Sequence, residues 1–158
     1  MKWQEVCEHP ALQDLPFKIE LNERGQLVMS PTKVKHSAFQ GKIAAMLQHL
    51  KPQGYVLTEC AIHTRKGTKV ADVAWVSPER FEQIRDELEC SVAPEICVEI
   101  MSSSNTEEEM AEKRELYFEM GAIEVWLCSE DGDIRFYDAT ARLKQSKMIP
   151  TFPQKIIL

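Results

Sequence analysis

The sequence predicts an α/β (α+β) domain in which a mixed sheet is flanked by helices. Three observations support this: apolar residues recur at helical spacing from 33 to 50, two alternating strands lie between 55 and 77, and a strand, turn, helix and strand run from 93 to 128. The element order is therefore αβββαβ. Turns at 22–25 and 131–133 add an N-terminal and a C-terminal hairpin.

Length and composition indicate a single domain. A chain of 158 residues with 44% hydrophobic content has enough apolar residues to fill one hydrophobic core but too few for two. We expect one domain over 1–158 with its core at about 17–138. The cysteines are odd in number and lack a CxxC pair, which argues against a disulfide framework or a four-ligand zinc site. We expect them to be reduced and mostly buried: Cys7, Cys60, Cys90, Cys97 and Cys128.

The overall charge and the absence of long apolar runs limit the classes of function. No segment is long and apolar enough to span a membrane, and the N-terminus lacks the hydrophobic stretch of a signal peptide. We therefore expect a cytoplasmic protein with no membrane partner. A net charge of −6 argues against a protein that coats nucleic acid. It does not argue against a nuclease, because an enzyme that binds divalent cations needs an acidic cluster.

Two predicted strands each contain an acid among hydrophobic residues. Asp72 lies in the strand 69–77 and Glu99 in the strand 96–101. A buried carboxylate needs a partner, and Lys113 falls within the apolar arc of the helix that follows Glu99. That pairing is either a structural ion pair or part of a site. Carboxylates on neighbouring strands can hold Mg²⁺, so the residues alone suggest a metal-assisted phosphodiesterase.

Local sequence signals predict where the second long helix begins and ends and how the chain terminates. Ser104 with Glu107 predicts a capping box and a helix that begins near Asn105, and Gly121 predicts its end. The C-terminal segment 155–158 is apolar enough to add an edge strand.

Other polar residues are placed less distinctively. His36 and Gln40 continue the apolar face of the helix 33–50, where a histidine is either hydrogen-bonded within the structure or borders a site. Glu20, within a hairpin strand, would ordinarily face solvent. Arg65 and Lys66, with Lys69, form a basic patch at a hairpin tip that either contacts phosphate or is only solvated.

The chain resembles the PD-(D/E)XK nuclease superfamily, whose αβββαβ order and motif acids match those above. The segments KIELNERGQLVMSP, VADVAWVS and APEICVEIMSSSNTEEEMAEKRELYFEMGAIEVWL, together with His36 and Gln40, more closely resemble a bacterial family catalogued as restriction endonucleases, whose domain has long been one of unknown function. The resemblance covers about Phe17 to Tyr137. It implies a restriction-endonuclease-like fold and a Mg²⁺-dependent or Mn²⁺-dependent endonuclease acting on DNA.

The resemblance also implies roles for individual residues. Asp72 and Glu99 correspond to the motif acids that bind metal, and the backbone carbonyl of Ile100 would be a third ligand. Glu20 and His36 match further positions that line the site. We expect Glu20 and Lys113 to be catalytic together with the two acids, His36 and Gln40 to contact substrate, and Arg65 and Lys66 to bind its phosphates.

The sequence departs from the family pattern at three positions. Ala71 stands where the motif has proline, Ser103 replaces the proline of S-P-S, and Met101 occupies the place of the motif lysine. The first two change the backbone only modestly. The third would disable catalysis unless another lysine took its role, and in the family a lysine on the next helix, here Lys113, does so.

Three alternative functions remain open at this level. The first is a catalytically inactive module on the same fold that binds nucleic acid or a protein, which the acidic balance favours. The second is a different metal-dependent hydrolase that uses His36 and His63. The third is a structural dimerising domain in which the charged residues form only ion pairs. Because no separate recognition domain is evident, any sequence preference would come from loops or from a homodimer, which we expect.

Overall fold

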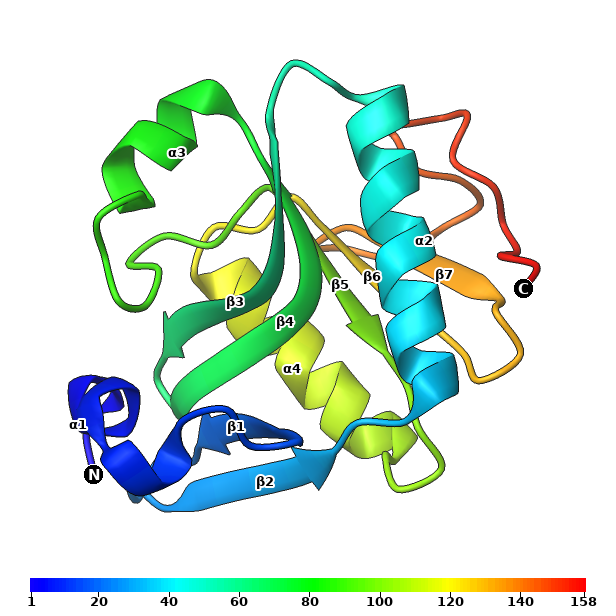
Figure 1. Ribbon diagram of the computed structural model, residues 1–158. Helices are drawn as coiled ribbons and strands as arrows, with labels where there is room; N and C mark the ends of the chain where they lie inside the picture. Colours follow the sequence, from blue (N-terminus) through cyan, green and yellow to red (C-terminus); the bar gives the residue numbers. More distant parts are fainter.

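A six-stranded mixed sheet forms the centre of the computed structural model, which describes all 158 residues (Figure 1). Its strands, in spatial order, are β3 (Tyr55–Thr64), β4 (Gly67–Val76), β5 (Ile96–Ile100), β6 (Glu124–Cys128), β7 (Ile134–Tyr137) and β8 (Arg142–Leu143). Only β5 and β6 pair in parallel, and all other neighbours are antiparallel. The predicted fold class is confirmed.

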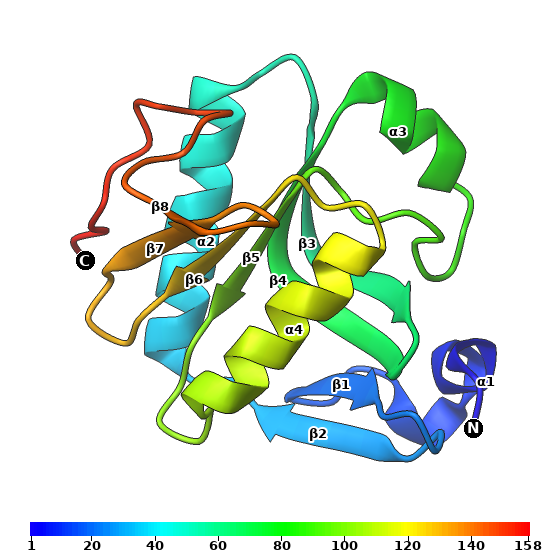
Figure 2. The ribbon, with the colours of Figure 1, turned by 180° about the vertical axis from the view of Figure 1, so that it is seen from behind.

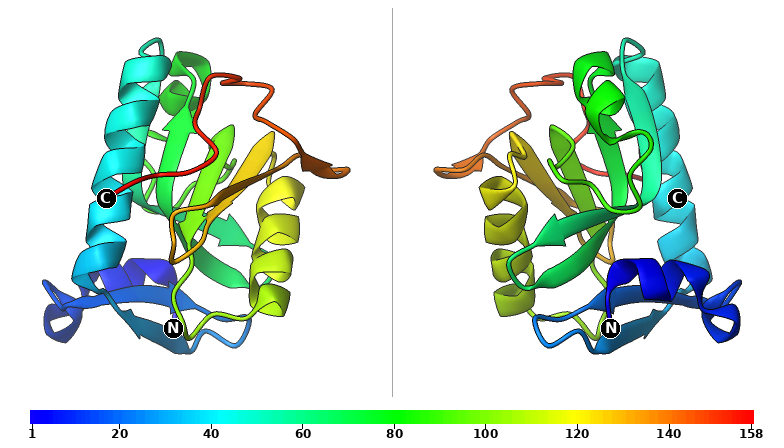
Figure 3. Two further views of the ribbon diagram at one scale, coloured as in Figure 1. Left: turned by 90° about the vertical axis from the view of Figure 1, so that its right-hand side faces the viewer. Right: turned by 90° about the vertical axis from the view of Figure 1, so that its left-hand side faces the viewer.

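Helices cover both faces of this sheet. The helices of the chain are α1 (Trp3–Glu8), which lies beside the N-terminal hairpin (Figure 1), α2 (Val34–Leu50), α3 (Pro78–Ile84) and α4 (Glu107–Glu119), with a 3-10 turn at Pro10–Leu12. Figure 3 shows α2 on one side of the sheet and α4 on the other. Because α4 connects the two parallel strands β5 and β6, it forms the crossover that parallel pairing requires. None of the helices is long and apolar enough to cross a membrane.

The predicted N-terminal hairpin forms a separate two-stranded sheet of β1 (Phe17–Leu21) and β2 (Leu27–Pro31). It lies across the end of the main sheet, near the start of α4 (Figure 2). At the tip of the β3–β4 hairpin, Gly67 has φ +89°, and a Cβ there would lie 2.3 Å from the Leu21 carbonyl oxygen. Only glycine allows the two hairpins to approach so closely, and this contact places β1 beside β4.

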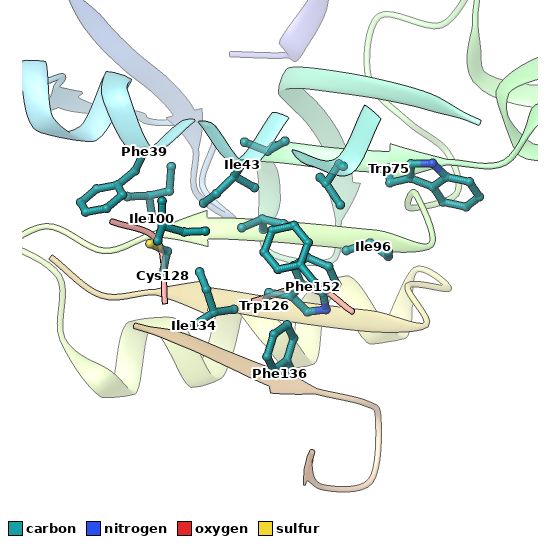
Figure 4. Packing of buried hydrophobic residues seen from close by; sticks show 14 of the residues in the cluster. Phe39, Ile43, Trp75, Ile96, Ile100, Trp126, Cys128, Ile134, Phe136 and Phe152 are labelled. Atoms are coloured by element: carbon teal, nitrogen blue, oxygen red, sulfur yellow. The ribbon is translucent and has the colours of Figure 1, made fainter. Parts of the chain in front are cut away.

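The larger core lies between α2 and the sheet. Phe39, Ile43 and Leu47 of α2 are almost fully buried against Ile96 and Trp126 of the central strands (Figure 4). The C-terminal segment closes the edge of this core with Ile149, Phe152 and Ile156. A second cluster fills the opposite face beneath α3 and α4 and includes Cys60, Cys90 and Cys97. Four of the five cysteines are buried, as expected.

The predicted capping box at Ser104 is wrong. The N-cap of α4 is Thr106, whose hydroxyl accepts a hydrogen bond from the backbone N–H of Glu109. Ser104 is instead held in the preceding loop, where its hydroxyl lies 2.9 Å from that of Ser102. The three glutamates at 107–109 still occupy the first turn, where the helix dipole favours negative charge, and the helix ends as predicted before Gly121, which has φ +102°.

The predicted edge strand at 155–158 does not form. Only an isolated bridge joins Lys155 to Asp133, and Ile156 points into the core. The reason lies in Glu124, a buried carboxylate at the start of β6. Its oxygens accept hydrogen bonds from the Trp126 indole, the Ser146 hydroxyl, and the backbone N–H groups of Lys147 and Met148. These contacts fold the final segment over the sheet face, and the short β8 becomes the edge.

We predict that Glu124→Gln lowers the free energy of unfolding by about 3 kcal/mol, because an amide group must meet two hydrogen-bond donors where the carboxylate accepted them. Equilibrium unfolding in urea measures this loss. The matched control is Glu130→Gln, a change at a solvent-exposed position, which should leave stability unchanged. Equal stabilities of the two variants would mean that Glu124 does not hold the C-terminal segment.

Candidate active site

The two acids singled out in the sequence meet in the structure. Asp72 lies on β4 and Glu99 on β5, each one residue beyond the cross-strand pair Val73 and Val98. They are 0% and 2% exposed, which places two carboxylates side by side in a region that water does not reach. Such a pair can persist only if positive charge compensates it.

Lys18 of β1 supplies much of that charge. Its ammonium nitrogen lies 3.1 Å from Oδ1 of Asp72 and 3.1 Å from Oε2 of Glu99, and the side chain is 11% exposed. The sequence reading missed this residue. Alternation along β1 could have found it, because side chains two apart share a face and Glu20 had already been placed near the site.

The remaining oxygens of the two acids have other partners. Oδ2 of Asp72 accepts a 2.7 Å hydrogen bond from the backbone N–H of Ile100. Oε1 of Glu99 accepts from the Tyr117 hydroxyl at 2.6 Å and from Lys113 at 3.2 Å. Each carboxylate is therefore fixed on one side by the fold and turns its other oxygen toward Lys18.

The expected pairing of Lys113 with Glu99 is confirmed by this geometry, and Lys113 also lies 2.8 Å from Glu20. Glu20 does not face solvent. Its side chain is 12% exposed and accepts a 2.7 Å hydrogen bond from the backbone N–H of Val70. The approach of β1 to β4 accounts for the difference, because it turns one face of a hairpin strand inward.

The polar end of α2 also reaches the site. Nε2 of His36 lies 3.4 Å from Oδ2 of Asp72, and the amide of Gln40 donates to the Asp72 carbonyl at 2.8 Å and to Glu59 at 2.9 Å. Nδ1 of His36 is buried without a hydrogen-bond partner. His63 lies elsewhere, 3.3 Å from Glu89, so the structure does not bring the two histidines together as a metal site.

The basic hairpin tip does not contact the buried acids. Arg65 forms an ion pair with Glu119 at 3.0 Å, and Lys66 pairs with Glu112, both on the exposed side of α4. A polar pocket contains Lys66 together with Glu20 and Lys113, so the tip borders the site without joining its charged cluster.

Burial and charge oppose each other in setting the pKa values of the cluster. Burial alone would raise the pKa of Asp72, but Lys18 and His36 outweigh it and hold that pKa below its usual range. Burial also raises the pKa of Glu99, an effect that Lys113 and Lys18 oppose. The pKa of Lys18 is well above normal, because attraction to Glu99 and Asp72 overcomes the effect of burial. Lys18 is therefore an ammonium ion throughout the neutral range.

The donor groups suit a hard divalent cation. Oδ1 of Asp72 and Oε2 of Glu99 converge on one position, which the ammonium of Lys18 fills. No group of three or more histidine, cysteine, aspartate or glutamate side chains is arranged to hold a metal. Two carboxylates completed by a backbone carbonyl and water form a set that Mg²⁺ accepts, because it retains several waters.

Comparison with known proteins assigns the family. The model of the Uma2 family, described as "Putative restriction endonuclease", matches residues 3–153. The chain belongs to the Uma2 family. This match confirms the resemblance drawn from the sequence and covers the sheet, both long helices and the N-terminal hairpin.

A solved structure agrees with this Uma2 assignment at the level of the fold. It is the crystal structure of a "putative nuclease belonging to DUF820" from Anabaena variabilis, with a TM-score of 0.70 and 18% sequence identity. The alignment covers 89% of the present chain and 81% of that one. No curated protein matches the chain.

The departures of this Uma2 chain from the motif are visible in the structure. Met101, in the place of the motif lysine, receives a hydrogen bond on its sulfur from Arg135 at 3.2 Å. The ammonium of Lys113 approaches Glu99 from α4 instead. Ala71 is fully buried beside Asp72, whereas Ser103 lies in the loop before α4.

We predict that Tyr117→Phe lowers the free energy of unfolding by roughly 2 kcal/mol, because Glu99 loses a hydrogen bond to a buried charged oxygen. Urea titration of both proteins measures the loss. Tyr55→Phe is the control, since Tyr55 is 46% exposed and should tolerate removal of its hydroxyl. An equal effect of the two changes would show that the Tyr117 hydroxyl does not stabilise Glu99.

Proposed function

We propose that this Uma2 chain is a Mg²⁺-dependent or Mn²⁺-dependent endodeoxyribonuclease that hydrolyses phosphodiester bonds in DNA. The observation that supports it is the convergence of Oδ1 of Asp72 and Oε2 of Glu99 on a single cation position. The family description and the nuclease-like fold support the same reaction class.

Asp72, Glu99 and the backbone carbonyl of Ile100 would hold the metal. A divalent cation bound there lowers the pKa of a water molecule and neutralises charge on the phosphate in the transition state. The fold orients the two carboxylates. The Ile100 N–H and the Tyr117 hydroxyl fix the two carboxylates before any ligand arrives, so little reorganisation is needed.

We assign to Lys113 the role of orienting the attacking water. Its ammonium is held by Glu20 and Glu99, and this places a charged donor beside the carboxylates without a motif lysine on β5. His36 and Gln40 hold Asp72 from the α2 side, through its Oδ2 and its carbonyl respectively. Their role is to position the metal ligand and line the substrate side of the site.

Basic residues lie along one approach to the site. A pocket of about 170 Å³ beside His36 and Ile100 is bordered by Lys33 and Lys35 of the loop and first turn that open α2. These ammonium groups suit the phosphates that flank a scissile bond. Arg65 and Lys66 could contact more distant phosphates only by giving up their glutamate partners on α4.

A catalytically inactive binding module is the second candidate. Two observations favour it: Met101 replaces the motif lysine, and Lys18 already neutralises the converging acids. The net charge of −6 further weakens nonspecific attraction to DNA. The two candidates differ in whether the protein binds a divalent cation.

The homodimer and the cytoplasmic location expected from the sequence stay predictions. A two-fold symmetric dimer would present two sites, one to each strand of a duplex. Size-exclusion chromatography with light scattering determines the mass in solution.

We predict that the wild-type protein nicks and linearises supercoiled plasmid with Mg²⁺ or Mn²⁺, and that Asp72→Asn and Glu99→Gln each reduce the rate by about 100-fold or more. Lys113→Met should do the same if the lysine orients water. Gel assays on supercoiled, linear duplex and single-stranded DNA, with an RNA of the same sequence, measure the rates and the substrate class.

Glu82→Gln is the matched control, because Glu82 pairs only with Arg85 on the surface. Cleavage at the wild-type rate by Asp72→Asn and Glu99→Gln would contradict the assignment of the two acids to the reaction. No cleavage by the wild type, together with no Mn²⁺ binding in calorimetry, would favour the binding module.

A further inference from the structure

One cation in the candidate site has no place in the reaction described above. Lys18 is 11% exposed, and its ammonium is equidistant, at 3.1 Å, from the two oxygens that converge on the metal position. It comes from β1, which belongs to the separate two-stranded sheet and not to the strands that carry the acids. Its position is therefore set by the docking of a hairpin.

We propose that Lys18 is a replaceable internal cation: its ammonium occupies the metal position in the metal-free protein and leaves when a divalent cation binds. This inference rests on the proposed function, because it concerns the same two acids. In this proposal Lys18 competes with the metal ion for two carboxylate oxygens, and this competition sets the metal concentration at which the site fills.

The hydrogen-bond assignments identify Lys18 as the replaceable partner. Oδ2 of Asp72 and Oε1 of Glu99 are bound by the backbone N–H of a central strand and by the hydroxyl of a fully buried tyrosine, groups that packing holds in place. Oδ1 of Asp72 and Oε2 of Glu99 are bound by Lys18. Withdrawal of one flexible side chain exposes both oxygens together.

The short distances around the two carboxylate oxygens exclude simultaneous binding of a metal ion and the Lys18 ammonium. Mg²⁺ binds carboxylate oxygens at about 2.1 Å, so an ion shared by the same two oxygens would lie close to the present ammonium position. Two cations cannot share that space, because their repulsion in a water-poor region is weakly screened.

Charge balance favours exchange over addition. Asp72, Glu99 and Glu20 face the ammonium groups of Lys18 and Lys113. A divalent cation that entered with both lysines in place would leave the three carboxylates outnumbered by four positive charges. If Lys18 leaves, the metal ion and Lys113 bring three positive charges to the three carboxylates, so exchange adds one positive charge less to the buried cluster than addition does, whatever the charge of His36.

The first test uses the wild-type protein. Lysine acetylation by an amine-reactive ester, quantified by mass spectrometry, should be slow at Lys18 in EDTA and at least severalfold faster with saturating Mn²⁺. Lys147, whose side chain is 71% exposed, serves as the internal reference. Labelling of Lys18 that does not change, in a protein that calorimetry shows to bind Mn²⁺, would overturn the inference.

The second test measures metal affinity. Lys18→Met should bind Mn²⁺ about tenfold or more tightly than the wild type in calorimetry. Its thermal midpoint should fall in EDTA and recover with Mn²⁺, since the paired acids then regain a cation. The matched control is Lys69→Met, because Lys69 is half-buried nearby but donates to the Leu21 carbonyl.

The outcomes separate the two proposals. Equal Mn²⁺ affinity of the wild type and Lys18→Met overturns the role of Lys18 and leaves the nuclease proposal intact. Binding by Lys18→Met alone would mean that Lys18 blocks the position without being displaced, which overturns the exchange and favours the inactive binding module for the wild type. No binding by either protein overturns the metal site itself, and with it both proposals.

Discussion

The pair of buried carboxylates on adjacent strands is the constraint on which this structure depends. Asp72 and Glu99 lie at the centre of the sheet, where an uncompensated charge would be very costly. Compensation comes from three separate parts of the fold: Lys18 from the N-terminal hairpin, Lys113 from α4, and His36 from α2. The charges thus connect three elements of the fold at one point.

This arrangement explains why the N-terminal hairpin docks where it does. The strand β1 makes no ladder with the main sheet, so backbone pairing does not hold it there. It is held by the ion pairs of Lys18, by the bond between Glu20 and the Val70 N–H, and by the close approach that Gly67 permits. A hairpin anchored largely by its contacts with the site will respond to changes in the charge of that site.

The replacement of the motif lysine follows a similar logic. A lysine at position 101 would extend from the end of β5, whereas Lys113 reaches Glu99 from the adjacent face of α4. The proposed reaction needs an ammonium group beside Glu99, and a lysine on either the strand or the helix could supply it. Glu20 on the hairpin holds the ammonium of Lys113 at 2.8 Å, beside Glu99.

The sequence by itself determined the order of elements, the mixed sheet, and the meeting of Asp72, Glu99 and Lys113. These follow from periodicity and from acids on apolar strands, which are local signals. Tertiary structure alone decided the positions of Lys18 and Tyr117 beside the acids, because their partners lie up to 81 residues away and depend on how a hairpin and a helix pack. It also decided the path of the C-terminal segment, since an apolar run shows that a segment is buried but not against which surface.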